Sequence, residues 1–190
     1  GRRTLVMGIL NVTPDSFSDG GRYMAVDAAV EHAVRMVRAG ADIIDIGGES
    51  TRPGSRPVPA DEEIRRVIPV IRAVREALPN VPLSIDTYKA ETARRALEAG
   101  AHIINDVWGL KADPEMARTA AEFGCPVVIS HNRLEAGGYA DIARDVAAEL
   151  LDSVRLAAEA GVDPRNIWLD PGIGFVKDYE DNLDMMGRLP

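Results

Sequence analysis

Short apolar segments alternate along this chain with longer segments whose apolar residues recur at helical spacing. Residues 5–10 are a continuous apolar run, the pattern of a strand buried on both faces. Residues 26–39 instead carry valines at intervals of three and four, which predicts a helix. The same reading predicts strands at 43–46, 83–85, 102–107, 126–129 and 167–169, and helices at 61–78, 90–99, 114–123, 140–160 and from about 181.

Particular residues mark the expected helix ends. Asp61 is the predicted N-cap of the helix over 61–78, and Pro114 suits the first turn of the helix over 114–123. A glycine that can adopt the left-handed turn closing a helix follows four predicted helices, at Gly40, Gly100, Gly124 and Gly161.

Strict alternation of strand and helix predicts an α/β fold with parallel strands and right-handed crossovers. Two architectures fit this order, a doubly wound open sheet and a TIM (β/α)8 barrel. We see no linker or shift in composition, so residues 1–190 are expected to form a single domain.

Polar residues at the strand ends separate the two architectures. A barrel gathers the carboxyl ends of all its strands around one mouth, whereas an open sheet binds ligands mainly at one switch point. Helix capping explains such residues one at a time, but polar groups at six successive strand ends favour the barrel. They are Asn11, residues 45–49, Asp86, Asn105 and Asp106, His131 and Asn132, and Asp170.

A barrel of this type has eight strand–helix units, and the pattern here reaches the sixth. An open arc of six strands would leave two unprotected edges. We therefore expect the chain to cover roughly the first six β/α units of a longer barrel, truncated at its C-terminal side.

Charge and composition exclude two classes of function. The net charge is −8 and the pI about 4.9, which argues against a nucleic-acid partner because nucleic-acid-binding surfaces are basic. No apolar run approaches the roughly 20 residues of a membrane helix, so no membrane partner is expected. The single cysteine, Cys125, stands in an apolar stretch and is interpreted as a buried structural residue, which indicates a cytoplasmic location.

Two connections after strands are long, at residues 11–25 and 47–60, and connections of this length are usually functional loops. Residues 11–21 read NVTPDSFSDGG, and residues 47–55 read GGESTRPGS. Three shorter motifs follow, SIDT at 84–87, IND at 104–106 and DPGIGF at 170–175.

These five motifs, in this order, resemble those of the dihydropteroate synthase family, the folate-pathway enzymes inhibited by sulfonamides. The resemblance covers nearly the whole chain. It implies a (β/α)8 barrel transferase that condenses 6-hydroxymethyl-7,8-dihydropterin diphosphate with p-aminobenzoate, giving 7,8-dihydropteroate and diphosphate with the help of Mg²⁺. It also implies a homodimer.

The resemblance assigns roles to residues of both loops and of the later motifs. Pterin contacts are expected from Asp86, Asn105 and Asp170, whose oxygens suit the row of amide and amine donors on a pterin. Asn11 is assigned to the magnesium ion and the diphosphate, since Mg²⁺ takes oxygen ligands and contacts few protein groups.

Loop residues complete the predicted site. Thr51 is expected to hydrogen-bond the substrate. Arg52 and Asp19 are catalytic candidates through phosphate binding and charge stabilisation, and Asn11 is the third catalytic candidate. Phe17 and Pro53 are expected to form the walls of the p-aminobenzoate slot. The wall beside the pterin is expected to consist of Gly172, Gly174 and Phe175. Glu49, Asp45 and Asp106 are either metal or base candidates or braces of the barrel mouth.

The chain departs from the family pattern in two places. Ser130 stands where relatives often have a methionine that packs on the pterin, so this wall is expected to be more polar. The family's later lysine and Arg-x-His pair have no counterpart within residues 1–190. Two alternatives follow: a pterin-binding barrel without this catalysis, and the related methyltetrahydrofolate-binding domain of corrinoid methyltransferases.

Overall fold

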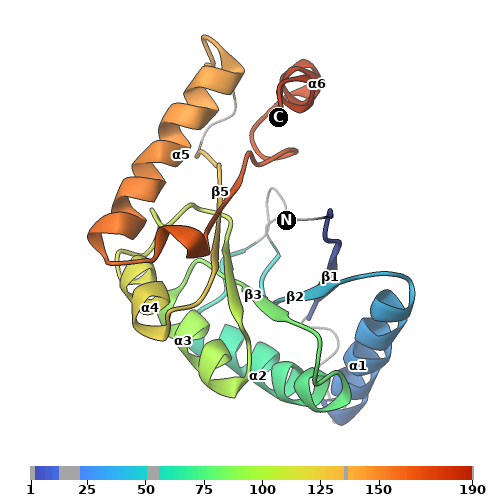
Figure 1. The fold of residues 1–190 in the computed structure, drawn as a ribbon. Helices are drawn as coiled ribbons and strands as arrows, with labels where there is room; N and C mark the ends of the chain where they lie inside the picture. Colours follow the sequence, from blue (N-terminus) through green and yellow to red (C-terminus); the bar gives the residue numbers. More distant parts are fainter. Residues whose placement is uncertain (1–2, 13–21, 51–55, 135–136, 190) are drawn as a thin grey trace. The chain divides into compact units, whose positions relative to one another are not determined.

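A computed structural model of the chain describes residues 3–12, 22–50, 56–134 and 137–189 (Figure 1). Strands and helices alternate throughout, as the sequence pattern predicts. The elements are β1 (Met7–Asn11), α1 (Arg22–Arg38), β2 (Ile43–Gly47), α2 (Ala60–Ala77), β3 (Leu83–Asp86), α3 (Ala90–Ala99), β4 (Ile103–Asp106), α4 (Met116–Phe123), β5 (Val127–Ser130), α5 (Ile142–Glu159), a short 3-10 turn (Pro164–Asn166), β6 (Ile167–Asp170) and α6 (Tyr179–Gly187).

The strands form a sheet in the order β1-β2-β3-β4-β5-β6, so each strand neighbours the next one in the chain. The pairs β1–β2, β2–β3 and β5–β6 are parallel. By its internal contacts the chain divides into two compact units, Gly1–Ile104 and Asn105–Pro190, which are described in turn.

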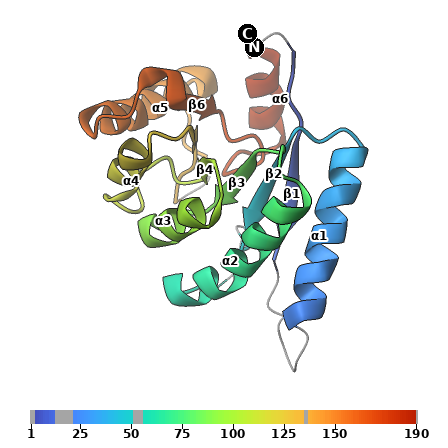
Figure 2. The same ribbon diagram turned by 60° about the horizontal axis from the view of Figure 1, so that its bottom comes forward.

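In the first unit, α1, α2 and α3 lie side by side against one face of β1, β2 and β3 (Figure 2). Ile44, Ile46 and Ile85 are fully buried on that face, and α2 contributes Val67, Val70 and Ile71 to the same core. β1 differs from the prediction of burial on both faces. Leu10 is 2% exposed but Ile9 is 61% exposed, because the helices of this unit pack on only one side of the strand.

The predicted helix ends are correct at the glycines and wrong at Asp61. Gly40, Gly100, Gly124 and Gly161 all have positive φ angles, as a left-handed turn requires. α2 begins at Ala60 with Pro59 as its N-cap residue, and no side chain caps it. Asp61 instead forms an ion pair with Arg65 one turn along the helix.

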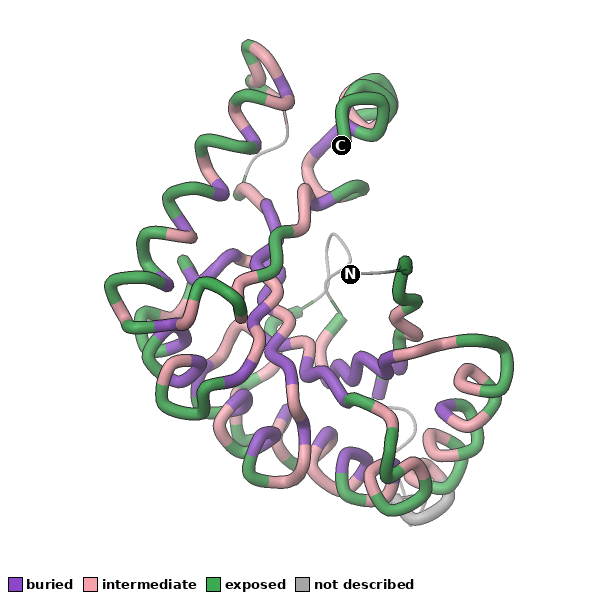
Figure 3. The backbone as a smooth tube through the Cα atoms, in the orientation of Figure 1, coloured by how far each residue is buried: buried purple, intermediate pink, exposed green. Residues whose placement is uncertain are grey.

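In the second unit, α5 packs against β5 and β6 and also contacts α4 and α6 (Figure 1). Its buried stripe of Ile142, Val146 and Leu150 faces inward while the opposite side of the helix is exposed, as Figure 3 shows. Cys125 is buried as predicted, and burial raises the pKa of its thiol to about 11. Within the part of the chain that the structure describes, no helix combines the length and apolar character needed to span a membrane.

Candidate active site

A row of strand-end residues forms one side of the candidate site in the first unit. The sheet register pairs Asn11 of β1 with Gly47 of β2, and Gly47 with Asp86 of β3. Asn11 is exposed and Asp86 is half-buried. A Cβ atom at Gly47 would lie 3.2 Å from Oδ2 of Asp86, so the missing side chain at position 47 leaves room for this carboxylate. The register therefore places the Asn11 carboxamide and the Asp86 carboxylate on either side of Gly47, which has no side chain.

Glu49 braces the start of the second long connection. Its Oε1 atom accepts a hydrogen bond from the Tyr88 hydroxyl at 2.8 Å. Its Oε2 atom accepts from the Lys89 ammonium at 2.5 Å and from the Val58 backbone N–H at 3.0 Å. Because Val58 lies near the far end of the connection, one carboxylate joins both ends of that segment to the residues that follow β3.

The Glu49 carboxylate is held in its ionised form. Burial by itself would raise the pKa of Glu49, but the bonds from Lys89, Val58 and Tyr88 outweigh it and lower the pKa. Lys89 shows the converse balance, in which burial lowers its pKa but bonds to Glu49 and the buried Glu63 raise it overall. A carboxylate engaged in this way is a brace, so of the two roles left open for Glu49 the structure supports the structural one.

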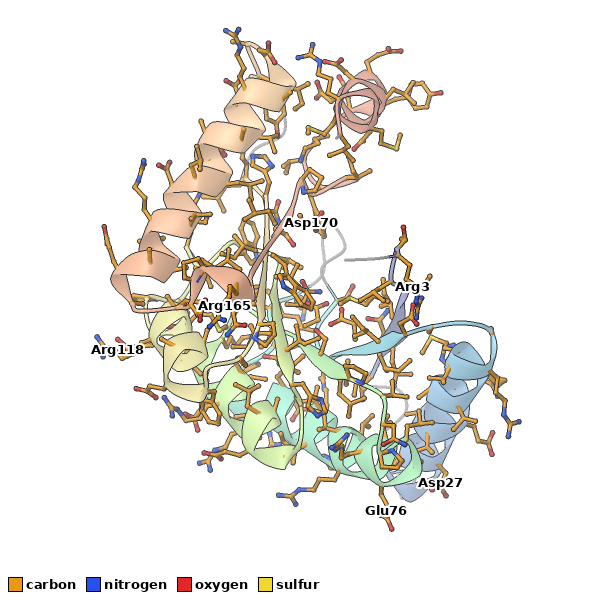
Figure 4. All side chains as sticks on the ribbon, in the orientation of Figure 1. Arg3, Asp27, Glu76, Arg118, Arg165 and Asp170 are labelled. Atoms are coloured by element: carbon orange, nitrogen blue, oxygen red, sulfur yellow. The ribbon has the colours of Figure 1, made fainter. Side chains whose placement is uncertain are left out.

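In the second unit, Ser130 and Asp170 stand opposite each other at the ends of β5 and β6. The Ser130 hydroxyl donates to Oδ2 of Asp170 at 2.9 Å, and the Gly172 backbone N–H donates to Oδ1 at 2.9 Å. Asp170 is half-buried and lies at the end of β6 opposite to the end near Arg165 (Figure 4). Both carboxylate oxygens therefore have a fixed donor while keeping lone pairs for a ligand.

The segment after β6 carries the predicted wall residues Gly174 and Phe175. The Phe175 backbone N–H donates to the Gly172 carbonyl at 3.0 Å, which closes a tight turn, and the Gly174 N–H donates to the Asn182 side chain at 2.7 Å. Gly172 has φ +68°, and a Cβ atom there would lie 2.0 Å from the His131 carbonyl oxygen. Only glycine allows this turn to pack so closely on the end of β5.

Lys177 is a buried residue of this region that sequence reasoning missed. Its ammonium lies 3.0 Å from Nδ1 of His131 and donates to the carbonyls of Gly172 at 2.9 Å and Phe175 at 3.1 Å. Nε2 of His131 lies 3.0 Å from Oε2 of Glu149. In the sequence, only the position of Lys177, two residues after the DPGIGF motif, connects it with the site. A lysine in such a loop is ordinarily interpreted as a solvent-exposed charge.

β4 supplies Asn105 and Asp106, which differ in environment. Asn105 is half-buried, whereas Asp106 is fully buried. Asp106 accepts hydrogen bonds from the backbone N–H groups of Trp108 at 2.8 Å and Leu110 at 3.0 Å. Burial, despite these bonds, raises the pKa of Asp106 to about 6. Both oxygens hold the turn after β4, so Asp106 is a brace.

Five predicted site residues lie outside the described part of the chain. They are Phe17 and Asp19 in the first long connection and Thr51, Arg52 and Pro53 in the second. Their assigned roles stay predictions.

A magnesium ion fits Asn11, the residue that the family resemblance assigns to the metal. Asn11 presents a neutral side-chain oxygen at an exposed strand end, in the same row as the half-buried Asp86. Mg²⁺ takes hard oxygen ligands and commonly binds through substrate phosphates and only one or two protein groups. The donor chemistry at Asn11 is therefore compatible with a metal ion carried largely by a phosphorylated substrate.

Comparison with known proteins gives consistent matches. The pterin binding enzyme family matches residues 7–190. The dihydropteroate synthase of Bacillus subtilis is 59% identical over 187 residues, which cover 98% of this chain and 65% of that protein. The chain thus spans about two thirds of the length of this relative.

Solved structures agree with the sequence matches over nearly the whole chain. Dihydropteroate synthase from Clostridium difficile, crystallised in the presence of pteroic acid, is 49% identical with a TM-score of 0.93, covering 99% of this chain and 71% of that one. The Xanthomonas albilineans enzyme with 4-aminobenzoic acid is 47% identical with a TM-score of 0.91, covering 99% and 68%.

These likenesses confirm the predicted architecture: a TIM barrel of which this chain forms a part, with the parallel strands in chain order. They also confirm the resemblance drawn from the five motifs. The chain belongs to the pterin binding enzyme family, among the dihydropteroate synthases.

Proposed function

We propose that this chain is the pterin-binding part of a transferase that makes 7,8-dihydropteroate for folate biosynthesis. The amine nitrogen of p-aminobenzoate would form a bond to the methylene carbon of 6-hydroxymethyl-7,8-dihydropterin diphosphate. The bond from that carbon to the diphosphate oxygen would break, diphosphate would leave with the electron pair, and the amine would lose a proton. High identity to dihydropteroate synthases over 98% of the chain carries this proposal.

The strand-end geometry supports the role of the polar residues. Asp86, Asn105 and Asp170 lie at the ends of three strands, and in a barrel such ends contribute side chains to one mouth. We assign these three residues to the donor-rich edge of the pterin. Unpaired buried polar groups would penalise other ligands, which gives the site its specificity.

Asn11 is assigned to the diphosphate side, with Mg²⁺ as its metal. The bound ion would neutralise charge on the departing diphosphate. Asn11 itself would orient the phosphate group through its side-chain amide. The predicted roles of Thr51, Arg52, Asp19, Phe17 and Pro53 belong to the same proposal and rest on the family resemblance.

A homodimer and a cytoplasmic location are further parts of the proposal. The first rests on the family resemblance, and the second on the single buried cysteine. Light scattering of the purified protein, and fractionation of cells that express it, would test them.

The experiment uses the full-length protein that contains this chain, given the pterin diphosphate, p-aminobenzoate and Mg²⁺. Formation of dihydropteroate with stoichiometric diphosphate is the expected result. The Asp86→Asn and Asp170→Asn variants should each lower kcat/KM by at least about tenfold, as expected when a charged hydrogen-bond partner is lost. Asp152→Asn, at an exposed position of α5, is the control. Pterin binding without product would instead identify a non-catalytic pterin-binding barrel.

A further inference from the structure

The buried ammonium of Lys177 is fully engaged by the protein. Lys177 lies between β6 and α6 and is 9% exposed. An ammonium group carries three N–H donors and no acceptor. Its three near neighbours are Nδ1 of His131 and the carbonyl oxygens of Gly172 and Phe175, at 2.9–3.1 Å. Each donor therefore has one partner, and all three partners are neutral groups.

This arrangement fixes the protonation state of His131. Because Lys177 can only donate, Nδ1 must be the accepting nitrogen, and the ring proton must reside on Nε2. The Nε2–H group then donates to Oε2 of Glu149 at 3.0 Å. Arg133 also binds Glu149, which keeps that carboxylate ionised. The imidazole is thus a neutral bridge between a buried cation on one side and an ion pair on the other.

The two carbonyls that Lys177 binds belong to the turn that also contacts the Asp170 carboxylate. Gly172 and Phe175 form the two ends of that turn through the bond between the Phe175 N–H and the Gly172 carbonyl. The Gly172 N–H in turn donates to Oδ1 of Asp170. A continuous chain of contacts therefore runs from the ammonium through the backbone of a single residue, Gly172, to a candidate pterin ligand.

We propose that Lys177 is a positioning residue for pterin binding, which ties the Gly172–Phe175 turn to His131 and thereby sets the orientation of Asp170. The proposal rests on the proposed function of this site. Lys177 acts through the turn and not through the substrate, since its three donors are used within the protein. Removing the ammonium would leave two buried carbonyls without this donor and release the turn from β5.

The test replaces Lys177 with methionine, which has a similar length and no charge, in the full-length protein. Lys111→Met is the matched control, because Lys111 is exposed and donates a single bond to the Glu149 carbonyl. Lys177→Met should raise the KM and Kd for the pterin diphosphate about tenfold, as expected for lost bonds to a charged group. The KM for p-aminobenzoate should stay within about twofold, and Lys111→Met should leave all values within about twofold.

A pair of substitutions at His131 tests the same linkage from its other end. The amide oxygen of asparagine reaches the position of Nδ1, whereas the amide of glutamine reaches that of Nε2. His131→Asn should therefore keep an acceptor for Lys177 and retain near-normal pterin affinity. His131→Gln should lose that acceptor and resemble Lys177→Met. Equal pterin affinity in the two variants would overturn the proposal, even if Lys177→Met fails to fold.

Hydrogen exchange separates this inference from the proposed function. The amides of residues 172–175 should exchange faster in Lys177→Met than in Lys111→Met, whether or not the protein turns over substrate. Absence of dihydropteroate formation by the unmodified protein would refute the function but leave this readout intact. Unchanged exchange at 172–175, or unchanged pterin affinity in a folded Lys177→Met protein, would refute the positioning role.

Discussion

The hydroxyl of Ser130 donates a 2.9 Å hydrogen bond to Oδ2 of Asp170 across the ends of two neighbouring strands. By the family resemblance a methionine is expected at this position in many relatives, and a thioether cannot donate such a bond. The more polar pocket wall expected from the sequence is therefore a serine hydroxyl that is bonded to the Asp170 carboxylate. The serine is 3% exposed and orients a carboxylate that we assign to the pterin.

Ser130→Ala is expected to weaken pterin binding while the protein remains folded. Loss of this bond leaves Asp170 held by Gly172 alone, and a typical net hydrogen bond is worth about 1 kcal/mol, or roughly fivefold in affinity. Calorimetric titration with the pterin diphosphate would measure the change. Ser153→Ala, at an equally buried serine on α5, is the control. Unchanged affinity in Ser130→Ala would show that Gly172 is sufficient to orient Asp170.

His131 should make stability depend on pH in a defined direction. Burial and the nearby Lys177 charge, with a smaller effect from Arg133, outweigh Glu149 and lower the pKa of His131 below 6.5. Below about pH 6.5 the unfolded chain therefore binds a proton at His131 that the folded chain does not. The contribution of neutral His131 is complete above that pH, and the free energy of unfolding falls as the pH decreases through it.

The measurement compares denaturant unfolding of the unmodified protein and His131→Asn at about pH 7.5 and about pH 5.5. The unmodified protein should lose up to about 1.4 kcal/mol more stability than the variant over this range, the value of one pKa unit. Asp106, with a pKa of about 6, changes stability in the opposite direction but is present in both proteins and cancels. Equal losses would mean that His131 titrates normally in the folded state.

Much of this fold was predictable because strands and helices differ strongly in pattern. Helix α3 occupies the expected residues 90–99, and the six strands lie within two residues of their predicted bounds. β1, β3 and β6 each extend to the polar residue that follows the predicted strand, at Asn11, Asp86 and Asp170. The positions of these strand ends could therefore be predicted from the sequence, because each apolar run is followed by a polar residue.

Long-range polar pairings were not predictable in the same way. Glu49 and Lys89 are 40 residues apart, and His131 and Lys177 are 46 residues apart, so no local periodicity links them. The burial of Lys177 depends on two backbone carbonyls of a turn, whose positions depend on the close approach of Gly172 to β5. Such contacts follow from three-dimensional packing, which a one-dimensional pattern does not contain.

Alanine substitutions at Gly172 and Gly174 should have different effects although both glycines have positive φ angles. A Cβ atom at Gly172 would lie 2.0 Å from the His131 carbonyl oxygen, whereas one at Gly174 would meet nothing within 4 Å. Gly174→Ala should cost about 1–2 kcal/mol of stability, from backbone strain alone. Gly172→Ala should cost about 3 kcal/mol or more, because backbone must also move. Urea unfolding would measure both, and equal losses would contradict the observed packing of the turn.

Glu49→Gln should destabilise the protein by about 1–3 kcal/mol, because Lys89 would lose one of its two carboxylate partners while the Tyr88 hydroxyl and Val58 N–H lose a charged acceptor. Glu76→Gln is the control: Glu76 is exposed on α2 and should change stability by less than about 0.5 kcal/mol (Figure 4).

The pH profile of kcat/KM distinguishes a brace from a base at Glu49. A brace whose pKa lies below the ordinary value stays ionised across the working range, so Glu49→Gln should lower activity evenly without moving the profile. Loss of the acidic limb of the profile, with stability unchanged, would instead identify Glu49 as a general base. Because the carboxylate already accepts bonds from three donors, we expect the first result.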